Sequence, residues 1–390
     1  MSQIPENSPT IEKYLRLICA ETVGSATFAR LVRHFGSLDR ALGATAGELA
    51  CVERIGQRTA ERIAASRDSF DTAAELALAS RLGVWIVSIA DRRYPVLLKR
   101  IYDPPPVLYI KGTLSRRDGL SVAIVGSRRC SVYGQEQACR LAHLLGSAGF
   151  TITSGMARGI DTAAHQGVLA ARGRTIAVQG CGLGHVFPPD NRGLFERISR
   201  FGACISDLPL TMGPRAENFP VRNRIIAGLS LGTIVVEAGL RSGAMITARL
   251  ALENNREVMA VPGKIDSPLS KGTHRLIKQG ARLVDCIDDV TEALGYIGNR
   301  LRGRITARAS RAEQLVESPP DGGGQLRLAE NERKVYGVLC AEPIHIDGIT
   351  AAAGLQAGSV NAALVSMQLK GLVRQYPGGL FALRGSCRAG

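Results

Sequence analysis

The chain has 390 residues, more than one ordinary hydrophobic core organises, so its length predicts two or three domains. Hydrophobic residues make up 45% of it, yet no apolar run reaches the length of a membrane span and the first residues do not resemble a signal peptide, which excludes a membrane protein and predicts a cytoplasmic location. The formal net charge of +15 favours polyanionic partners, although arginines on solvated faces would give the same sum.

The first segment, residues 1–80, shows helical spacing broken by glycine and is predicted to be a small helical domain of the helix-hairpin-helix or SAM-like kind. Residues 53–63, ERIGQRTAERI, resemble a helix-hairpin-helix, in which a glycine turn directs the N-H groups of a helix start at a phosphate. Arg54 stands where such hairpins usually carry their first glycine. A plain helical packing module is therefore an equal alternative. The stretch 84–112 that follows is extended, because its three consecutive prolines are incompatible with a helix.

The middle segment, residues 84–296, is predicted to be an α/β domain with an extended Rossmann-like parallel sheet. Short β-branched runs, each ending at glycine or a polar turn, alternate with amphipathic stretches of helical length. The runs are SVAIVG, FTITSG, RTIAVQG, ACISD, GTIVVEA and EVMAVPG. Strict alternation indicates crossover units and a parallel sheet covered on both faces. Such sheets bind ligands beyond the carboxyl ends of their strands, so the residues that follow each strand are the functional candidates.

The last part of the chain divides into a linker and a small domain. Residues 297–325 are rich in arginine, proline and glycine and are predicted to form a flexible basic linker. Residues 326–390 are predicted to form a winged helix, with the wing turn around Pro377-Gly378-Gly379. The expected recognition helix, 357–370, has Lys370 as its one basic residue, whereas a helix in a DNA groove needs several phosphate partners. A protein contact is therefore favoured for this domain over a nucleic-acid contact.

The turn after the first strand of the middle segment departs from a dinucleotide site. Gly126 is followed by Ser-Arg-Arg, and the next strand ends without the carboxylate that would bind a ribose. We therefore expect no NAD and no other cofactor. Ser127 and free N-H groups at a helix start can bind phosphate, and the guanidinium fork of Arg128 matches phosphate oxygens. An ion pair across the turn is the alternative for Arg128.

The turn after the second strand repeats this design with Ser154 and Gly155. Asp161 is predicted to cap the next helix by accepting a hydrogen bond from the N-H of Ala163 or Ala164. No partner for His165 can be identified from the sequence.

The phrase ENFPVRNRIIAGLS combines an aromatic ring with polar groups at a helix start. The ring is Phe219, and the polar residues are Arg222, Asn223 and Arg224. Base stacking, phosphate pairing and an amide hydrogen bond within one loop are typical of single-strand binding, because only unpaired bases expose their faces to a ring. Alternatively, Phe219 is a hydrophobic staple and one arginine pairs with Glu217.

The loops after the later strands add Glu237 and two weaker candidates for phosphate contact, Lys264 and His274. Glu237 is the one carboxylate expected at the mouth. No Ser-His-Asp order, paired acids or metal-ligand spacing is present, and the nine cysteines include no Cys-x-x-Cys pair. We therefore expect a binding protein without a catalytic or metal site.

The ordered motifs of the middle segment resemble the DprA/Smf family of DNA-processing proteins. They are GSRRCSVYG, SGMARGIDTAAH, GCGLGHVFPPDN, NFPVRNRIIAGLSLGTIVVEA, SGAMITARLALE and AVPGKIDSPLSKGTHRLIKQGA. The resemblance implies a cytosolic homodimer that binds and protects incoming single-stranded DNA in natural transformation and loads the RecA recombinase. It places the DNA pocket on Ser127, Arg128, Ser154, Gly155, Phe219, Arg222, Asn223 and Arg224, with Lys264 and His274 as weaker members. Here SGAMIT replaces the commoner Ser-Gly-Ser-Leu.

Two other functions compete with this hypothesis. The same fold is similar to nucleoside-monophosphate phosphoribohydrolases, and LGTIVVE keeps Gly232, Thr233 and Glu237 of their motif. However, it lacks the earlier glycine pair and has one residue too many before the acid. A reader of duplex DNA through the winged helix is the third possibility, which duplex binding stronger than single-strand binding would indicate.

Overall fold

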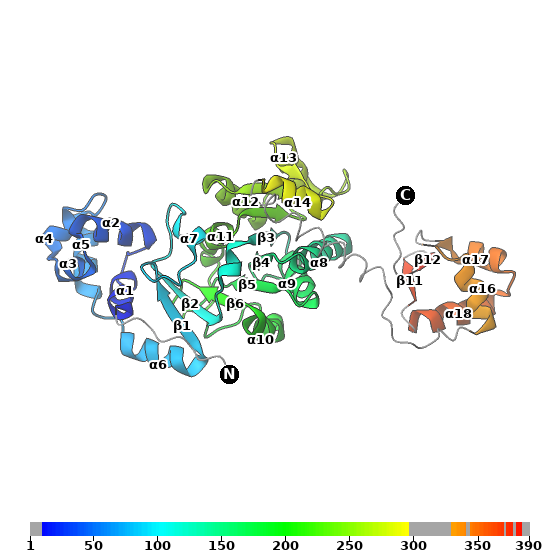
Figure 1. Ribbon diagram of the computed structural model, residues 1–390, viewed down its shortest axis with the longest axis horizontal. Coiled ribbons are helices and arrows are strands. Elements are labelled where there is room, and N and C mark those ends of the chain that lie inside the picture. Colours follow the sequence, from blue (N-terminus) through cyan, green and yellow to red (C-terminus); the bar gives the residue numbers. More distant parts are fainter. Residues whose placement is uncertain (1–9, 296–328, 341–343, 370–371, 377–379, 384–390) are drawn as a thin grey trace. The chain divides into compact units, whose positions relative to one another are not determined.

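The computed structural model describes residues 10–295, 329–340, 344–369, 372–376 and 380–383 (Figure 1). These residues belong to two compact units, Met1–Ala312 and Glu313–Gly390, which are described separately below. The predicted linker, 297–325, lies outside the described residues. No helix in the described ranges combines the length and the apolar content that crossing a bilayer requires.

The first unit begins with short helices packed around a common core. They are α1 (Ile11–Ile18), α2 (Ser25–Phe35), α3 (Leu38–Gly43), α4 (Ala46–Ala50), α5 (Gln57–Ser66) and α6 (Thr72–Leu82). In the turn between α4 and α5, Arg54 has a φ of 62°, the left-handed conformation that usually selects glycine. The turn geometry of the predicted hairpin therefore exists here although its first glycine is replaced.

The centre of the first unit is a nine-stranded sheet with the order β1-β2-β6-β5-β4-β3-β7-β8-β9. Its strands are β1 (Val84–Ser88), β2 (Val107–Gly112), β3 (Ser121–Val125), β4 (Thr151–Ser154), β5 (Arg174–Val178), β6 (Ala203–Ser206), β7 (Gly232–Val235), β8 (Glu257–Ala260) and β9 (Arg282–Leu283). The six predicted strands are β3 to β8, and neighbours among them pair in parallel.

The sheet is mixed rather than wholly parallel. The extended stretch 84–112 supplies β1 and β2, which pair with each other in antiparallel fashion, and β2 continues the sheet antiparallel to β6. The sequence predicted that this stretch is extended but not that it joins the sheet. The prolines at 104–106 lie in the loop before β2, where no backbone N-H is needed for the ladder.

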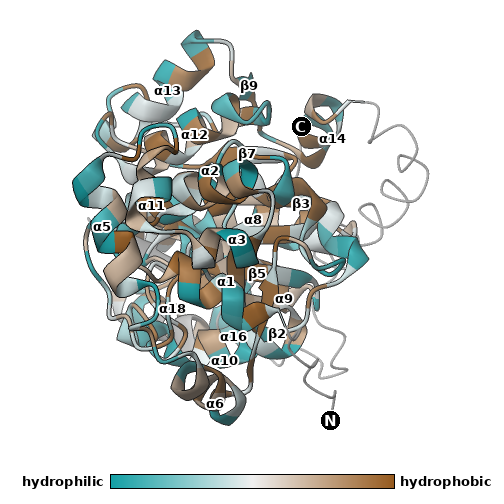
Figure 2. Ribbon diagram, turned by 90° about the vertical axis from the view of Figure 1, so that its left-hand side faces the viewer, coloured by the Kyte–Doolittle hydropathy of each residue, from teal (hydrophilic) through white to brown (hydrophobic). Residues whose placement is uncertain are grey.

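Helices cover both faces of the sheet. They are α7 (Val96–Lys99), α8 (Val132–Ser147), α9 (Ile160–Ala170), α10 (Arg192–Phe201), α11 (Asn218–Gly228), α12 (Gly243–Glu253), α13 (Lys271–Lys278) and α14 (Ile287–Ala293). Alternate residues of β3 enter different cores: Val122 and Ile124 pack with α8, α9 and α14, whereas Ala123 and Val125 pack with α11 and α12. In Figure 2 the ribbon at β3 is brown, which marks hydrophobic residues. Because helices cover both faces, every residue of β3, β4, β6 and β7 is buried.

The second unit is a winged helix, as predicted. It contains α16 (Glu330–Val338), β10 (Ile344–His345), α17 (Ile346–Ala353), α18 (Ala357–Leu369), β11 (Val373–Tyr376) and β12 (Leu380–Leu383), with the strand order β10-β12-β11. The helix α18 takes the place of the expected recognition helix and has no basic residue within its bounds. Lys370 and the wing turn at 377–379 lie outside the described residues.

Candidate nucleic-acid interface

A pocket of about 870 Å³ opens at the carboxyl ends of β3 and β7. Much of its lining comes from three segments: the turn after β3, the start of α11 and the loop that leads into α12. Their polar and aromatic members are Ser127, Arg128, Arg129, Phe219, Arg222, Asn223, Arg241 and Ser242. Because the strands are parallel, the loops that follow them meet at one end of the sheet, as the sequence predicted.

The turn after β3 is held by two hydrogen bonds of Ser127 and presents a cation that forms no ion pair in the described part of the chain. The N-H of Ser127 donates to the carbonyl of Glu237 at 2.7 Å, and its hydroxyl accepts from the N-H of Arg129 at 3.1 Å. Arg128 is exposed, and within the described residues no carboxylate pairs with it. Its guanidinium carbon lies 5.1 Å from the centroid of the Phe219 ring. Within the described residues, Arg128 therefore does not form the ion pair that was its alternative role.

The Phe219 ring forms an aromatic wall of the pocket. The ring is partly exposed and lies 5.2 Å from the ring of Phe187, measured between centroids, at an interplanar angle of 51°. A Cβ atom added at Gly180 would come within 2.8 Å of it, so the ring rests on bare backbone. The ring is thus held in place on one side and accessible from the pocket.

Arg222 is buried, which corrects its predicted role as a phosphate ligand. Its side chain donates through Nη1 to the carbonyl oxygen of Gly155 at 2.5 Å and to that of Val178. The residue is 4% exposed, and burial lowers the pKa of its guanidinium to about 10. Although Arg222 lines the pocket floor, its main contacts are with the ends of β4 and β5, so it holds those strand ends together.

Arg224 is committed to carboxylates away from the pocket, which is a second correction. Its Nη2 lies 2.7 Å from Oδ2 of Asp207, and its Nε lies 3.5 Å from Oδ2 of Asp103. The residue is 6% exposed and is not among those that line the pocket. The predicted trio of arginines therefore separates into one accessible cation, Arg128, and two structural ones.

The turn after β4 also serves the fold rather than the pocket surface. The hydroxyl of Ser154 is fully buried and donates to the carbonyl of Ile124 at 2.6 Å. Gly155 lies against the guanidinium of Arg222, where a Cβ would come within 2.7 Å of Cζ, so a larger residue would have to displace that guanidinium. These placements correct the prediction that Ser154 and Gly155 contact phosphate directly.

Asp161 is buried beneath this turn and is bonded to its main chain. Asp161 accepts hydrogen bonds from the N-H groups of Gly155 at 3.1 Å and Ala157 at 3.3 Å, not from its own helix as predicted. Burial raises the pKa of the Asp161 carboxyl, and the neighbouring Arg222 partly opposes that change.

His165 has a partner that the sequence did not reveal. Its Nδ1 lies 2.8 Å from the hydroxyl of Thr175, which itself donates to the carbonyl of Ile152 at 2.7 Å. Thr175 is therefore the acceptor, so Nδ1 of His165 carries the proton. Complete burial lowers the pKa of His165 to about 3 and keeps the ring neutral.

Asn223 lines the pocket and joins two of its segments. Its Nδ2 donates to the carbonyl of Gly243 at 3.3 Å, which ties the start of α11 to the start of α12. Ser242 caps α12 by accepting from the N-H of Ala244 at 3.3 Å. Asn223 therefore contributes a polar side chain to the pocket wall, and its contact with DNA stays a prediction.

Glu237 clamps the start of α8 instead of facing the mouth. Its Oε1 accepts from the hydroxyl of Ser131 at 2.6 Å, and its Oε2 accepts from the N-H of Ser131 at 2.8 Å. Glu237 is 4% exposed. Both carboxylate oxygens are thus occupied, and the expectation of an acid at the mouth is corrected.

Lys264 and His274 lie outside this pocket. His274 donates from Nε2 to the carbonyl of Gly263 at 3.0 Å and lines a separate depression with Lys271 and Arg275. Lys264 is exposed. Conversely, Arg129 and Arg241 line the main pocket but were not selected from the sequence. Their positions directly beside Arg128 and Ser242 were the available signal.

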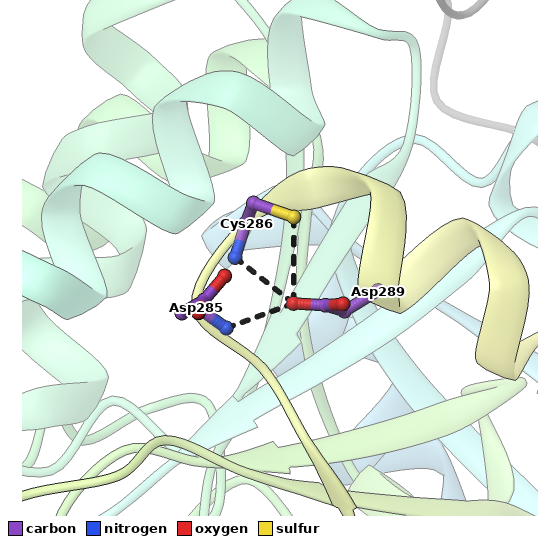
Figure 3. Close-up of side chains that lie close together, drawn as sticks. All are labelled: Asp285, Cys286 and Asp289. Atoms are coloured by element: carbon purple, nitrogen blue, oxygen red, sulfur yellow. Dashed lines mark hydrogen bonds between the residues drawn. The ribbon is translucent and has the colours of Figure 1, made fainter. Parts of the chain in front are cut away.

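A cluster of possible metal ligands, Asp285, Cys286 and Asp289, lies at the start of α14 (Figure 3). The carboxylate of Asp289 accepts from the N-H groups of Asp285 at 3.0 Å and Cys286 at 3.2 Å, and also from the Cys286 thiol. These bonds cap the start of a short helix. We assign the cluster that structural role.

Three family models match the chain in the order of its segments. The DNA recombination-mediator protein A model matches residues 85–295, the DprA-like N-terminal HHH domain matches 12–69, and the DprA winged helix domain matches 319–379. The first of these alone spans more than half of the chain.

Individual relatives agree with the family models. The chain is 36% identical to Protein Smf of Synechocystis over 381 residues, covering 91% of this chain and 94% of that protein. It is 44% identical to DNA processing protein DprA of Streptococcus pneumoniae over 203 residues, 52% of this chain and 72% of that protein. The X-ray structure of the Streptococcus pneumoniae protein superposes with a TM-score of 0.63 at 35% identity and covers 71% of this chain and 96% of that one.

Proposed function

This chain belongs to the DprA/Smf family of DNA recombination-mediator proteins, and from that premise we propose that it binds single-stranded DNA during DNA processing in transformation. The proposal rests on the position of Arg128 over the Phe219 ring at the mouth of the pocket. The guanidinium carbon lies 5.1 Å from the ring centroid. A ring offers a stacking face to any unpaired base, while the adjacent guanidinium offers two donors to a phosphate.

The charges of the pocket support a polyanionic ligand. Arg128, Arg129 and Arg241 are exposed at its rim, and in the described part of the chain none of them forms an ion pair. Asp161 is the one acid among the described lining residues, and its carboxylate is buried against the N-H groups of the turn. Uncompensated cations at a rim attract phosphates in a salt-dependent way.

We infer that the pocket does not hydrolyse nucleoside monophosphates. The glutamate that the hydrolase motif would use is Glu237, and both of its carboxylate oxygens accept hydrogen bonds from Ser131. A buried acid held in this way cannot reach a substrate without releasing the start of α8. Incubation of the protein with nucleoside monophosphates should release no free base.

The family resemblance extends the proposal to partners. We propose that the protein acts as a homodimer in the cytoplasm, protects incoming strands and loads RecA recombinase onto them. We further propose that the winged helix contacts a protein, since α18 has no basic residue for DNA phosphates. Weaker binding of duplex than of single strands at matched salt would support this division of roles.

The proposal is tested by the salt dependence of oligothymidine binding to the full chain. Arg128→Gln should weaken binding and lower the slope of log K against log salt by about 0.7, the value for one lost phosphate contact on a single strand. Arg81→Gln, at an exposed position of α6 that is not among the residues lining the pocket, is the control and should leave the slope unchanged. Equal slopes for all three proteins would refute the pocket assignment.

A further inference from the structure

A second basic pocket lies where the parallel strands of the central sheet begin, opposite to the first pocket at their carboxyl ends. It has a volume of about 430 Å³ and is built from the segments that precede β3, β4 and β5 and from the last residue of α10. Its lining includes Arg117, Thr151, Arg172, Arg174 and Phe201. Because strands rise about 3.3 Å per residue, the five-residue β5 separates this end of the strands from the first pocket by roughly 16 Å.

This second pocket has an excess of positive charge. Arg174 is neutralised by Asp118, with Nε and Oδ1 2.5 Å apart. Arg117 and Arg172 are both exposed, and neither has an ion-pair partner in the ranges that the structure describes. The described lining residues include no aspartate or glutamate. Two cations therefore face solvent here without compensation.

The backbone at Arg172 indicates that this charge is not incidental to the turn. Arg172 ends the turn after α9 with a φ of 53°, in the left-handed region where glycine is favoured and other residues cost about 1 kcal/mol or more. A glycine at 172 would adopt this conformation without that cost. A cationic side chain thus occupies a position that local folding does not select for it.

An aromatic ring accompanies the two cations. Phe201 is 55% exposed, which is unusual for a phenylalanine and leaves a ring face open to solvent. Gly146, Gly149 and Gly173 also line the pocket and keep its backbone free of side chains. An open ring beside unpaired guanidinium groups is the combination that suits single strands, whereas an acidic peptide would need the cations alone.

We propose that this pocket is a second binding site for single-stranded DNA. One protomer would then hold two DNA segments, one at each end of its parallel β-strands. The first pocket and the second share a ligand class, and in that respect the inference rests on the proposed function. The two sites use different residues, however, and each can be removed separately. Arg117 and Arg172 bind phosphates of the second segment, and Phe201 stacks on one of its bases.

Stoichiometric titration of the full chain with a short fluorescent oligothymidine, at low salt, tests the proposal. The wild-type protein should bind two strands per protomer, and Arg117→Gln/Arg172→Gln should bind one. Arg40→Gln/Arg81→Gln removes the same charge at exposed positions outside both pockets and should still bind two. One strand per wild-type protomer, or two for the Arg117→Gln/Arg172→Gln protein, would overturn the second site.

The same titration separates the two assignments. Arg128→Gln/Arg241→Gln should abolish the other binding event and leave the second site occupied. If that variant still binds two strands, the first pocket is wrongly assigned whatever happens at the second.

Phe201→Leu distinguishes DNA from an acidic protein as the occupant. Because the ring is more than half exposed, the substitution should leave folding intact and weaken the second event on the order of 5- to 150-fold, the factor for one lost stacked base. Two results together would refute a DNA site, because they would show that the site selects charge only. Phe201→Leu would bind the second strand with unchanged affinity, and polyglutamate at equal charge concentration would displace that strand.

Discussion

Replacing Arg222 with methionine should destabilise the first unit rather than only weaken DNA binding. The substitution keeps an unbranched, largely apolar stem but removes the guanidinium donors that satisfy the carbonyl oxygens of Gly155 and Val178. A buried acceptor left without a donor costs about 1 to 3 kcal/mol, so two of them cost about 2 to 6 kcal/mol. Domains are stable by about 5 to 15 kcal/mol, and the loss is therefore a large fraction of the total.

Urea unfolding followed by tryptophan fluorescence measures this loss. The chain has one tryptophan, Trp85, which is 4% exposed in β1 and reports on the first unit alone. Arg128→Met is the matched comparison, because it removes an exposed guanidinium and should change the free energy of unfolding by less than about 0.5 kcal/mol. A wild-type unfolding midpoint for Arg222→Met, combined with a reduced salt slope of oligothymidine binding, would show that Arg222 contacts phosphate and that our structural assignment is wrong.

Three further predictions concern the ring, the buried histidine and the winged helix. Phe219→Leu should weaken oligothymidine binding by about 1 to 3 kcal/mol through lost stacking, and unchanged affinity would make the ring a packing residue only. Folding lowers the pKa of His165 to about 3, so below pH 6.5 the unfolded chain takes up the proton first, and stability should fall by about 2 kcal/mol between pH 7 and pH 5. His165→Gln should remove that part of the fall in urea midpoints, and an identical pH dependence in both proteins would contradict the assignment. Removal of residues after 325 should leave single-strand affinity within about twofold of the full chain, and a larger loss would place DNA contacts in the winged helix.

The sequence by itself determined strands β3 to β8 and the end of the sheet where the candidate binding loops meet. Each strand from β3 to β8 is a short β-branched run that ends in a turn, and such signals are local, so they can be read without the fold. The parallel pairing followed from the alternation of strands and helices. The hairpin of β1 and β2 could not be placed in this way, because its partner β6 lies about a hundred residues later in the chain.

Only the tertiary structure decided which cations are accessible. Arg222 and Arg224 stand two residues apart in a phrase that also contains Phe219, yet the first is satisfied by the carbonyl of Val178 and the second by Asp207. Both partners come from other strand ends. Arg128 has the same side chain and remains exposed beside the ring. Composition and spacing state which charges a segment carries, whereas the partner of each charge is fixed by segments distant in sequence that folding brings together.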